Sequence, residues 1–277
     1  MRALLELLRP GNAVMSAAAV GIGGVVALGA TVAVDRWPSI ALGALTAFLF
    51  TGAGNALNDF YDRDVDRVNH PRRPIPSGRI QPKAAFDVAL ALFLLALLST
   101  LFVNVAAFGL VLVSLALMIG YEVRLKSSGW SGNLLIGWLV GSLFLFAGLC
   151  VSRGDARPLQ VAASLAMLAG LSTVGREVMK DIEDAAGDVG RATLPKTRGI
   201  PFATRVAQSF TLAAVALSVL PAGLGILGVG YFAVVPFADA TLIFAAFYSA
   251  RSPARSERLM KVGMAVALVA FLAGGLT

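Results

Sequence analysis

Oxygen-bearing side chains recur at helical spacing within residues 58–67, which read Asn-Asp-Phe-Tyr-Asp-Arg-Asp-Val-Asp-Arg. Asn58, Asp62 and Asp66 stand four residues apart, so on a helix they lie on one face. Carboxylates at this spacing repel each other, and the repulsion grows where a membrane lowers the dielectric constant. A cation on this face would relieve the repulsion, and oxygen ligands without nearby His or Cys favour Mg²⁺ or Ca²⁺ over zinc.

A second acidic run occupies residues 177–188, which read Glu-Val-Met-Lys-Asp-Ile-Glu-Asp-Ala-Ala-Gly-Asp. Its aspartates at 181, 184 and 188 share a helical face. A solvated, charged helix end explains either run alone, but two such faces, each beside Arg and Lys, favour a metal site. Mg²⁺ typically combines a few protein carboxylates with substrate phosphates. The predicted Mg²⁺ ligands are Asn58, Asp62, Asp66, Asp181, Asp184 and Asp188.

Basic residues surround both acidic faces and are suited to clamp a diphosphate between them. Arg67 directly follows Asp66 and is the first candidate contact, with Arg63 and Arg72 in the same segment. Anchoring of this segment to anionic lipid is the competing interpretation for these arginines. A substrate with a diphosphate head and a lipid tail would satisfy both the charges and the membrane character described next.

The composition indicates a membrane protein. Apolar residues make up 57% of the chain and charged residues 14%, and the mean hydropathy is +0.80. A soluble domain carries roughly 25% charged residues, so most of this surface faces something other than water. The single Cys and single His argue against a disulfide framework, a Cys-rich metal site, and zinc or haem chemistry.

Apolar runs of about 20 residues predict the elements that position these side chains. We expect an all-α polytopic membrane bundle of about nine transmembrane helices, forming one domain over 1–277, with a central cavity open to the cytoplasmic side. Asn104 divides one long apolar run and predicts a tight helical hairpin there. The expected spans are 12–34, 40–61, 84–103, 105–122, 133–152, 159–178, 202–221, 226–248 and 258–276.

The basic residues segregate to one side of this predicted topology. Of the 23 Lys and Arg residues, all except Arg36, Arg153 and Arg157 fall at the N-terminus or in the loops on its side. By the positive-inside rule, that side is cytoplasmic, and it carries both acidic runs. The net charge of +7 therefore indicates anionic headgroups or phosphorylated substrates as partners, rather than nucleic acid.

A weak internal repeat accompanies the two runs. Asp62-x₃-Asp66 ends the second span and Asp184-x₃-Asp188 follows the sixth, and each leads into a basic segment that contains proline, 76–80 and 195–200. Duplication and convergent loop chemistry both explain this likeness.

Five further polar residues are candidates for the pocket. Tyr121 and Lys126 lie where the fourth span ends, and a belt tyrosine with a snorkelling lysine explains them as well as substrate binding does. Asn12 is an odd polar choice at the start of the first span, and Lys180 lies within the second acidic run. Asp239 falls deep in the eighth span, where a charge is costly unless it is paired or protonated.

The motifs Asn58-Asp59-x₂-Asp62-x₃-Asp66 and Asp184-x₃-Asp188 resemble the two signatures of the UbiA family of intramembrane prenyltransferases. The likeness also covers the nine spans and the placement of Tyr121 with Lys126. It implies a Mg²⁺ cofactor, a prenyl diphosphate donor, and phosphate binding by Lys126. The catalytic carboxylates would be those of Asp62, Asp66, Asp184 and Asp188.

Within that family, residues 69–80 resemble two branches, the archaeal enzymes that act on geranylgeranylglyceryl phosphate and the chlorophyll synthases. Residues 176–188, followed by Thr-Leu-Pro at 193–195, are more similar to the archaeal branch. This implies transfer of a geranylgeranyl group from geranylgeranyl diphosphate to that lipid phosphate. The same chemistry on an aromatic acceptor such as 4-hydroxybenzoate is the nearest alternative, and a cation-binding transporter is the alternative from another class.

Overall fold

The computed structural model describes residues 2–29, 34–125, 129–185 and 192–277. Within these residues every regular element is helical. The elements are α1 (Arg2–Leu8), α2 (Pro10–Leu28), η1 (Val34–Arg36), α4 (Trp37–Tyr61), α5 (Arg63–Asn69), α6 (Pro82–Thr100), α7 (Val105–Val123), α8 (Trp130–Val151), α9 (Ala156–Asp184), α10 (Leu194–Arg198), α11 (Ile200–Leu217), α12 (Leu220–Gly223), α13 (Val229–Tyr248) and α14 (Pro253–Gly275).

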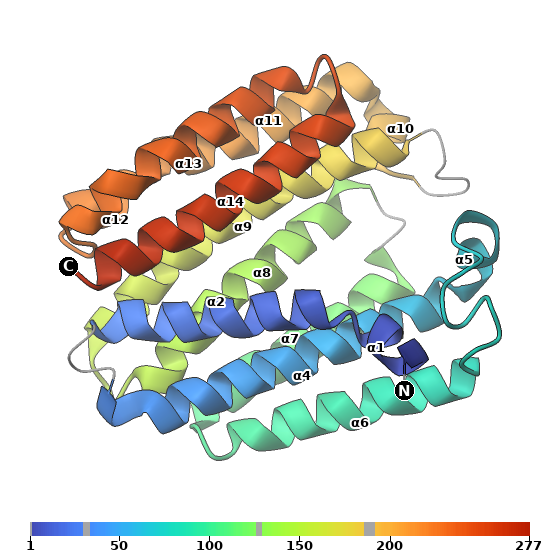
Figure 1. Ribbon diagram of the computed structural model, residues 1–277, viewed down its shortest axis with the longest axis horizontal. Coiled ribbons are helices and arrows are strands. Elements are labelled where there is room, and N and C mark those ends of the chain that lie inside the picture. Colours follow the sequence, from blue (N-terminus) through green and yellow to red (C-terminus); the bar gives the residue numbers. More distant parts are fainter. Residues whose placement is uncertain (1, 30–33, 126–128, 186–191) are drawn as a thin grey trace.

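Nine of these described segments are long and apolar enough to cross a membrane, the seventh combining α11 and α12. The chain is therefore a multi-pass membrane protein, as the sequence predicts. The long helices run along the long axis of the bundle, with α5, α10 and the N-terminus at one end and α12 and the C-terminus at the other (Figure 1). We call the first of these the motif end, because both α4 and α9 finish there.

The boundaries of α9 differ most from the predicted span, which stopped at 178. The helix has 29 residues, about 43 Å at a rise of 1.5 Å per residue, against about 30 Å for a bilayer's hydrocarbon core. The second acidic run, as far as Asp184, therefore lies on the last turns of the membrane helix itself. Arg176, Glu177 and Lys180 are spaced for contacts on one helical surface, which lets the helix continue through a polar stretch.

The predicted hairpin at Asn104 is confirmed. The Asn104 side-chain oxygen accepts a hydrogen bond from the Ala107 backbone N–H at 2.8 Å and so caps the start of α7. Its amide nitrogen donates to the Leu149 carbonyl on α8 at 2.7 Å. One residue thus turns the chain and ties the hairpin to a third helix.

Glycines let α8 and α9 approach closely along a seam of Gly137, Gly141 and Gly148. A Cβ at Gly141 would lie 2.7 Å from the Ala166 carbonyl oxygen, and one at Gly148 would lie 2.5 Å from the Ala162 Cβ. Small residues at such spacing are the usual means by which membrane helices pack backbone to backbone. The seam fixes α9, and with it the second acidic run, against α8.

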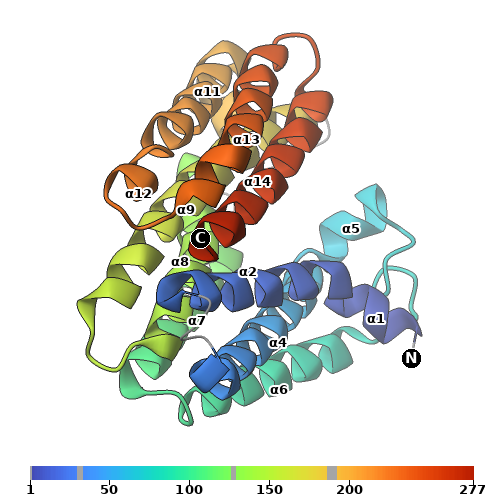
Figure 2. The ribbon, with the colours of Figure 1, turned by 60° about the vertical axis from the view of Figure 1, so that its left-hand side comes forward.

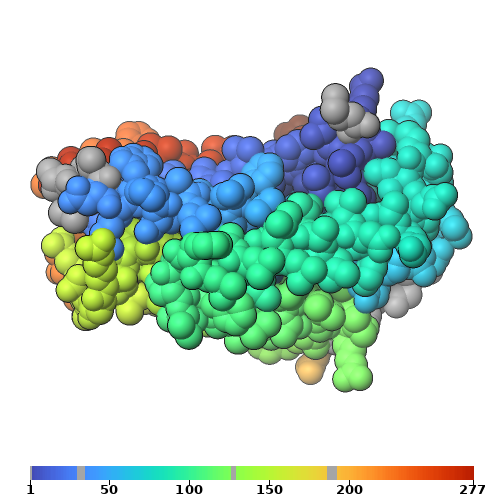
Figure 3. Space-filling model, turned by 90° about the horizontal axis from the view of Figure 1, so that it is seen from below, coloured from blue at the N-terminus to red at the C-terminus, as the bar shows by residue number. Residues whose placement is uncertain are grey.

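The outer surface of α6 and α7 is apolar. Exposed leucines follow one another at Leu90, Leu94 and Leu98 on α6, and Leu112 and Val113 are exposed on α7. These two helices form much of the face seen in Figure 3. A continuous apolar face of this kind fits contact with lipid tails.

A cavity of about 1050 Å³ lies inside the bundle. Figure 2 shows α11, α13 and α14 grouped together, and α1, α2, α4 and α6 in a second group that the end of α14 meets at α2. Side chains from both groups, and from α7, α8 and α9, line the cavity. The central cavity predicted from the sequence is therefore present.

Candidate active site

The cavity joins an apolar interior to a polar mouth. Its interior is lined by side chains such as Phe50, Phe144, Leu168 and Phe271. Its polar lining comes largely from the ends of α2, α4, α7 and α9 at the motif end. These polar residues include Arg9, Asn12, Asn58, Tyr121, Glu122, Arg176, Glu177 and Lys180.

The first acidic run spans the junction of α4 and α5 at Asp62. The Asp62 N–H donates to the Asn58 carbonyl at 2.9 Å, and the Asp66 N–H donates to the Asp62 carbonyl at 2.8 Å. The helical spacing of these three residues therefore continues across the junction, although α4 ends at Tyr61 and α5 begins at Arg63. Asp62 is half-buried and Asp66 is buried.

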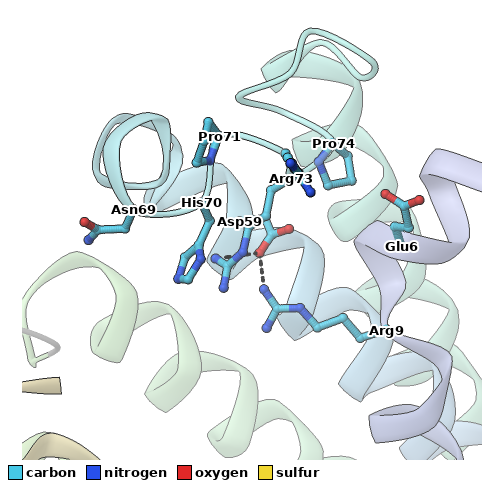
Figure 4. Close-up of a pocket in the computed structure, with 9 residues that line it drawn as sticks. Glu6, Arg9, Asp59, Asn69, His70, Pro71, Arg73 and Pro74 are labelled. Atoms are coloured by element: carbon cyan, nitrogen blue, oxygen red, sulfur yellow. Dashed lines mark hydrogen bonds and ion pairs between the residues drawn. The ribbon is translucent and has the colours of Figure 1, made fainter. Parts of the chain in front are cut away.

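Two arginines from outside the run neutralise its buried carboxylates. Arg73 contacts Asp66 at 2.5 Å and Asp59 at 3.6 Å, and Arg9 forms an ion pair with Asp59. Figure 4 shows Arg9 directed at Asp59 from the start of α2, with Arg73 approaching from the segment after α5. Burying two carboxylates would be costly without such partners. Sequence reasoning had given Arg9 no chemical role and had not paired Arg73 with these carboxylates.

Arg9 also has an unusual backbone. Its φ of 47° and ψ of 67° place it in the left-handed region, which disfavours side chains other than glycine. The following Pro10 disfavours helical geometry at Arg9, so the break between α1 and α2 was readable from the sequence. Arg9 lines both the large cavity and a smaller pocket of about 430 Å³ formed with residues 69–74. The Arg9–Asp59 pair therefore lies where the two spaces adjoin.

Two of the three predicted diphosphate arginines, Arg63 and Arg67, have local partners. Arg63 donates to the Phe60 carbonyl at 2.8 Å and lies over the Phe60 ring at 4.8 Å. Arg67 is exposed and pairs with Asp64 at 3.0 Å. Arg72 is exposed and lines the smaller pocket. Their binding of a diphosphate stays a prediction.

Asn58 connects the first run to α7. Its amide nitrogen donates to Glu122 Oε1 at 3.0 Å, and Glu122 is buried beside Tyr121 in the cavity wall. Asn12 and Tyr121 both line the cavity, as expected of pocket residues. Lys126 lies outside the described residues.

The second run is built from different contacts. Asp181 accepts a hydrogen bond from the Asn133 amide of α8 at 2.8 Å, and Asp184 is exposed at the last residue of α9. Lys180 lines the cavity and pairs with Glu177 at 3.5 Å. Asp188 lies outside the described residues.

Charged residues of α9 and α14 form a network beside this run. Arg176 pairs with both Glu177 and Glu257, at 3.2 Å in the second case, and Lys261 pairs with Glu257 at 2.8 Å. Sequence reasoning placed Glu177 in the second acidic run and counted Arg176 and Lys261 with the loop charges, but it did not connect any of them to Glu257. The signal for the pair on α14 was its four-residue spacing, which is typical of a helical ion pair.

The acidic residues have the chemistry of a hard-cation site, but of the predicted ligands that the structure describes only Asn58 lines the cavity. Among the described residues, no three His, Cys, Asp or Glu side chains gather closely enough to hold a metal ion by themselves. The predicted ligands that the structure describes are nevertheless oxygen donors in the segment from α4 to α5 and on α9, and both segments reach the motif end (Figure 1). Such a donor set fits Mg²⁺ shared with a phosphorylated substrate better than an all-protein cage.

Asp239 of α13 lies in the cavity wall with hydroxyl partners. The Ser218 hydroxyl lies 2.8 Å from Asp239 Oδ2, and the Tyr231 hydroxyl donates to the Ser218 carbonyl at 2.8 Å. A polar partner reduces the cost of a carboxyl group deep in a spanning helix.

Comparison with known proteins gives concordant likenesses. The model of the UbiA prenyltransferase family matches residues 14–273. A digeranylgeranylglyceryl phosphate synthase from Methanothrix thermoacetophila is 40% identical over 276 residues, 98% of this chain and 98% of that protein. A solved structure of a digeranylgeranylglyceryl phosphate synthase in membranes has a TM-score of 0.82 at 29% identity, over 99% of this chain and 98% of that one.

A more distant structure carries ligands. A UbiA homologue from Archaeoglobus fulgidus bound to GPP and Mg²⁺ has a TM-score of 0.68 at 17% identity, over 99% of this chain and 98% of that one. At this identity the likeness to the present chain is one of fold. The ligands show what that homologue binds.

Proposed function

Because this chain belongs to the UbiA prenyltransferase family, we propose that it transfers a geranylgeranyl group from geranylgeranyl diphosphate to geranylgeranylglyceryl phosphate. The reaction would be a step of archaeal-type ether lipid synthesis. The cavity is the observation that carries this proposal, because it joins an apolar interior to a mouth lined with carboxylates and cations. Both substrates have the same division into apolar tail and phosphorylated head.

Asn58, Asp62 and Asp66 of the first run, and Asp181, Asp184 and Asp188 of the second, are the residues we assign to Mg²⁺ binding. When bound, Mg²⁺ would neutralise charge on the diphosphate and favour its departure. Arg63, Arg67, Arg72, Lys126 and Lys180 are the basic residues proposed to contact phosphate groups.

The protein's own part in the reaction is positioning and exclusion of water. The C1–O bond of the donor breaks and its electron pair leaves with the diphosphate, while the acceptor hydroxyl oxygen bonds to C1. The hydroxyl proton passes to an Asp of the mouth or to the released diphosphate. Cationic side chains at the mouth stabilise the leaving group, and the apolar lining around Phe50 and Phe144 keeps water from the allylic carbon.

The motif end is proposed to face the cytoplasm, since nearly all Lys and Arg lie on that side. In a chain with Cys150→Ala, a cysteine at exposed Ser77 should react with an impermeant maleimide in inverted vesicles and not in intact cells. The opposite pattern would reverse the orientation.

A panel of acceptors tests the reaction. Purified enzyme with Mg²⁺ and geranylgeranyl diphosphate should prenylate geranylgeranylglyceryl phosphate and release one diphosphate for each ether bond formed. Efficient prenylation of 4-hydroxybenzoate instead would mean that the acceptor is aromatic and that the lipid assignment is wrong. If no acceptor in the panel supported release of diphosphate from the donor, a cation-binding transporter would be favoured. Against a transporter, transport sites lie near the bilayer midplane, whereas these acidic runs lie at one end of the bundle.

A further inference from the structure

The last helix carries a basic residue far inside the bundle. Lys261 stands eight residues after Pro253, the first residue of α14, which is about 12 Å along the helix. Arg176 stands eight residues before the end of α9, an equal depth from the motif end. Ionisable residues within a spanning helix usually line a cavity or pair with one another, and they often mark a functional site.

Two glutamates that are more buried than the lysines form ion pairs with these cations. The side chains of Glu177 and Glu257 are only 11% and 6% exposed, whereas those of Lys180 and Lys261 are 51% and 58% exposed. Both lysines line the cavity. The glutamates therefore hold the lysines in position, and the ammonium groups are accessible to a substrate in the cavity.

The network carries a surplus of positive charge. Arg176, Lys180 and Lys261 contribute three positive charges to the described ion pairs, against two negative charges from the glutamates. An ammonium group has three N–H donors, so one carboxylate contact leaves capacity for another acceptor. A net positive charge in a membrane cavity is best balanced by an anionic ligand.

Below Lys261 the same face of α14 becomes apolar. Met264, Ala265, Leu268 and Phe271 line the cavity and follow Lys261 by three, four, seven and ten residues. This spacing forms one helical stripe, extending about 15 Å beyond the lysine at 1.5 Å per residue. A cation followed by an apolar stripe matches a single amphiphile with an anionic head and a long hydrocarbon tail.

We infer that Lys261, with Lys180, binds the phosphate of the lipid acceptor, and that its tail lies along α14. This inference rests on the proposed function. Lys180 lies beside the second acidic run, whereas Lys261 belongs to a helix that carries neither run, so the site adjoins the carboxylates assigned to Mg²⁺ and extends away from them along α14. Arg176 holds Glu177 and Glu257 in place and acts as a positioning residue.

The test compares two acceptors, geranylgeranylglyceryl phosphate and the same lipid without its phosphate. Lys261→Gln should lower the ratio of their kcat/KM values on the order of ten- to a hundredfold, the loss expected for a hydrogen bond to a charged group. The KM for geranylgeranyl diphosphate should change less than about threefold, within the effect of a weak surface contact. Because both acceptors are assayed in one sample, the ratio does not depend on the fraction of protein that is folded.

Two variants control the measurement. Lys261→Arg keeps the charge and should restore most of the preference for the phosphorylated acceptor. Arg258→Gln removes a charge from an exposed position of α14 that does not line the cavity, and it should leave the ratio unchanged. An unchanged ratio in Lys261→Gln, or a rise in the KM for the donor instead, would overturn the inference while leaving the proposed function intact. A wild-type enzyme that does not use the phosphorylated acceptor would overturn both.

Discussion

The two acidic runs have similar sequences but different electrostatic surroundings. At the junction of α4 and α5, the buried carboxylates of Asp59 and Asp66 face guanidinium groups of Arg9 and Arg73. At the end of α9, Asp181 is held by the neutral amide of Asn133, and Asp184 is exposed. Similar spacing of acidic residues thus gives one region whose buried carboxylates pair with guanidinium groups, and another in which Asp181 accepts a hydrogen bond from a neutral amide.

This difference separates carboxylates that hold the fold together from carboxylates that bind the metal, two roles that the sequence alone does not distinguish. The Asp59 pairs join α2, α4 and the segment after α5, so they secure the arrangement of three chain segments. Asp62 and Asp184 are more accessible than Asp59, and we expect them to carry more of the metal chemistry. Asp66 is both an ion-pair partner of Arg73 and a predicted metal ligand, so a cation that binds Asp66 must share this carboxylate with Arg73.

The largest expected effect is on turnover. Asp62→Ala and Asp184→Ala should each reduce kcat by roughly 10³-fold while the protein stays folded, because each removes one side of a metal clamp. The measurement is the rate of diphosphate release at saturating Mg²⁺. Comparable losses in both variants would show that the two regions act on one metal-bound substrate.

Asp87→Ala is the matched control for this comparison. Asp87 is exposed on α6, where it pairs with Lys83 at 3.7 Å, and it belongs to neither run. A loss of activity in this variant as large as in the other two would mean that the carboxylates act through surface charge. Retained activity in Asp62→Ala alone would make the first region purely structural.

The next effect is on stability. Asp59→Asn leaves Arg9 and Arg73 facing a neutral side chain, and breaking such a pair should cost about 3 kcal/mol, the low end of the range for buried pairs because both arginines are partly exposed. Asn133→Ala removes one hydrogen bond to Asp181 and should cost about 1 kcal/mol. Thermal unfolding in detergent should therefore show a clearly larger loss for Asp59→Asn.

Asp64→Asn should have the smallest effect, under about 0.5 kcal/mol, because the Asp64–Arg67 pair is exposed to solvent. If Asn133→Ala proved as destabilising as Asp59→Asn, the amide contact would be as important to the fold as the guanidinium contacts. The contrast between the two regions would then be wrong.

Much of the fold followed from the sequence because hydropathy and charge act locally. The apolar runs predicted nine spans, Asn104 predicted the α6–α7 hairpin, and the charge distribution placed both acidic runs at one end. The predicted end of α9 came too early because its last turns are polar. Hydropathy does not predict a helical segment that is stabilised by ion pairs rather than by apolar contacts.

The partners of the carboxylates could not be predicted in the same way. Asp59 pairs with Arg9 across 50 residues of sequence, and Asn133 reaches Asp181 across 48. Such contacts depend on which helices pack side by side, and no local spacing encodes that. The sequence did not single out Lys261 for the same reason, since its proposed role depends on the packing of α14 beside α9.

The glycine seam between α8 and α9 has a consequence for how freely chains of this kind can diverge. Exposed positions such as Leu90, Leu94 and Leu98 are suited to contact with lipid tails, among which one apolar side chain can replace another at little cost. At Gly141 even a methyl group would collide with a backbone carbonyl, which cannot move aside as a side chain can. Sequence drift is therefore cheap over the outer surface and blocked along one narrow line, so distant chains can lose most of their identity and still hold the same helices at the same separation.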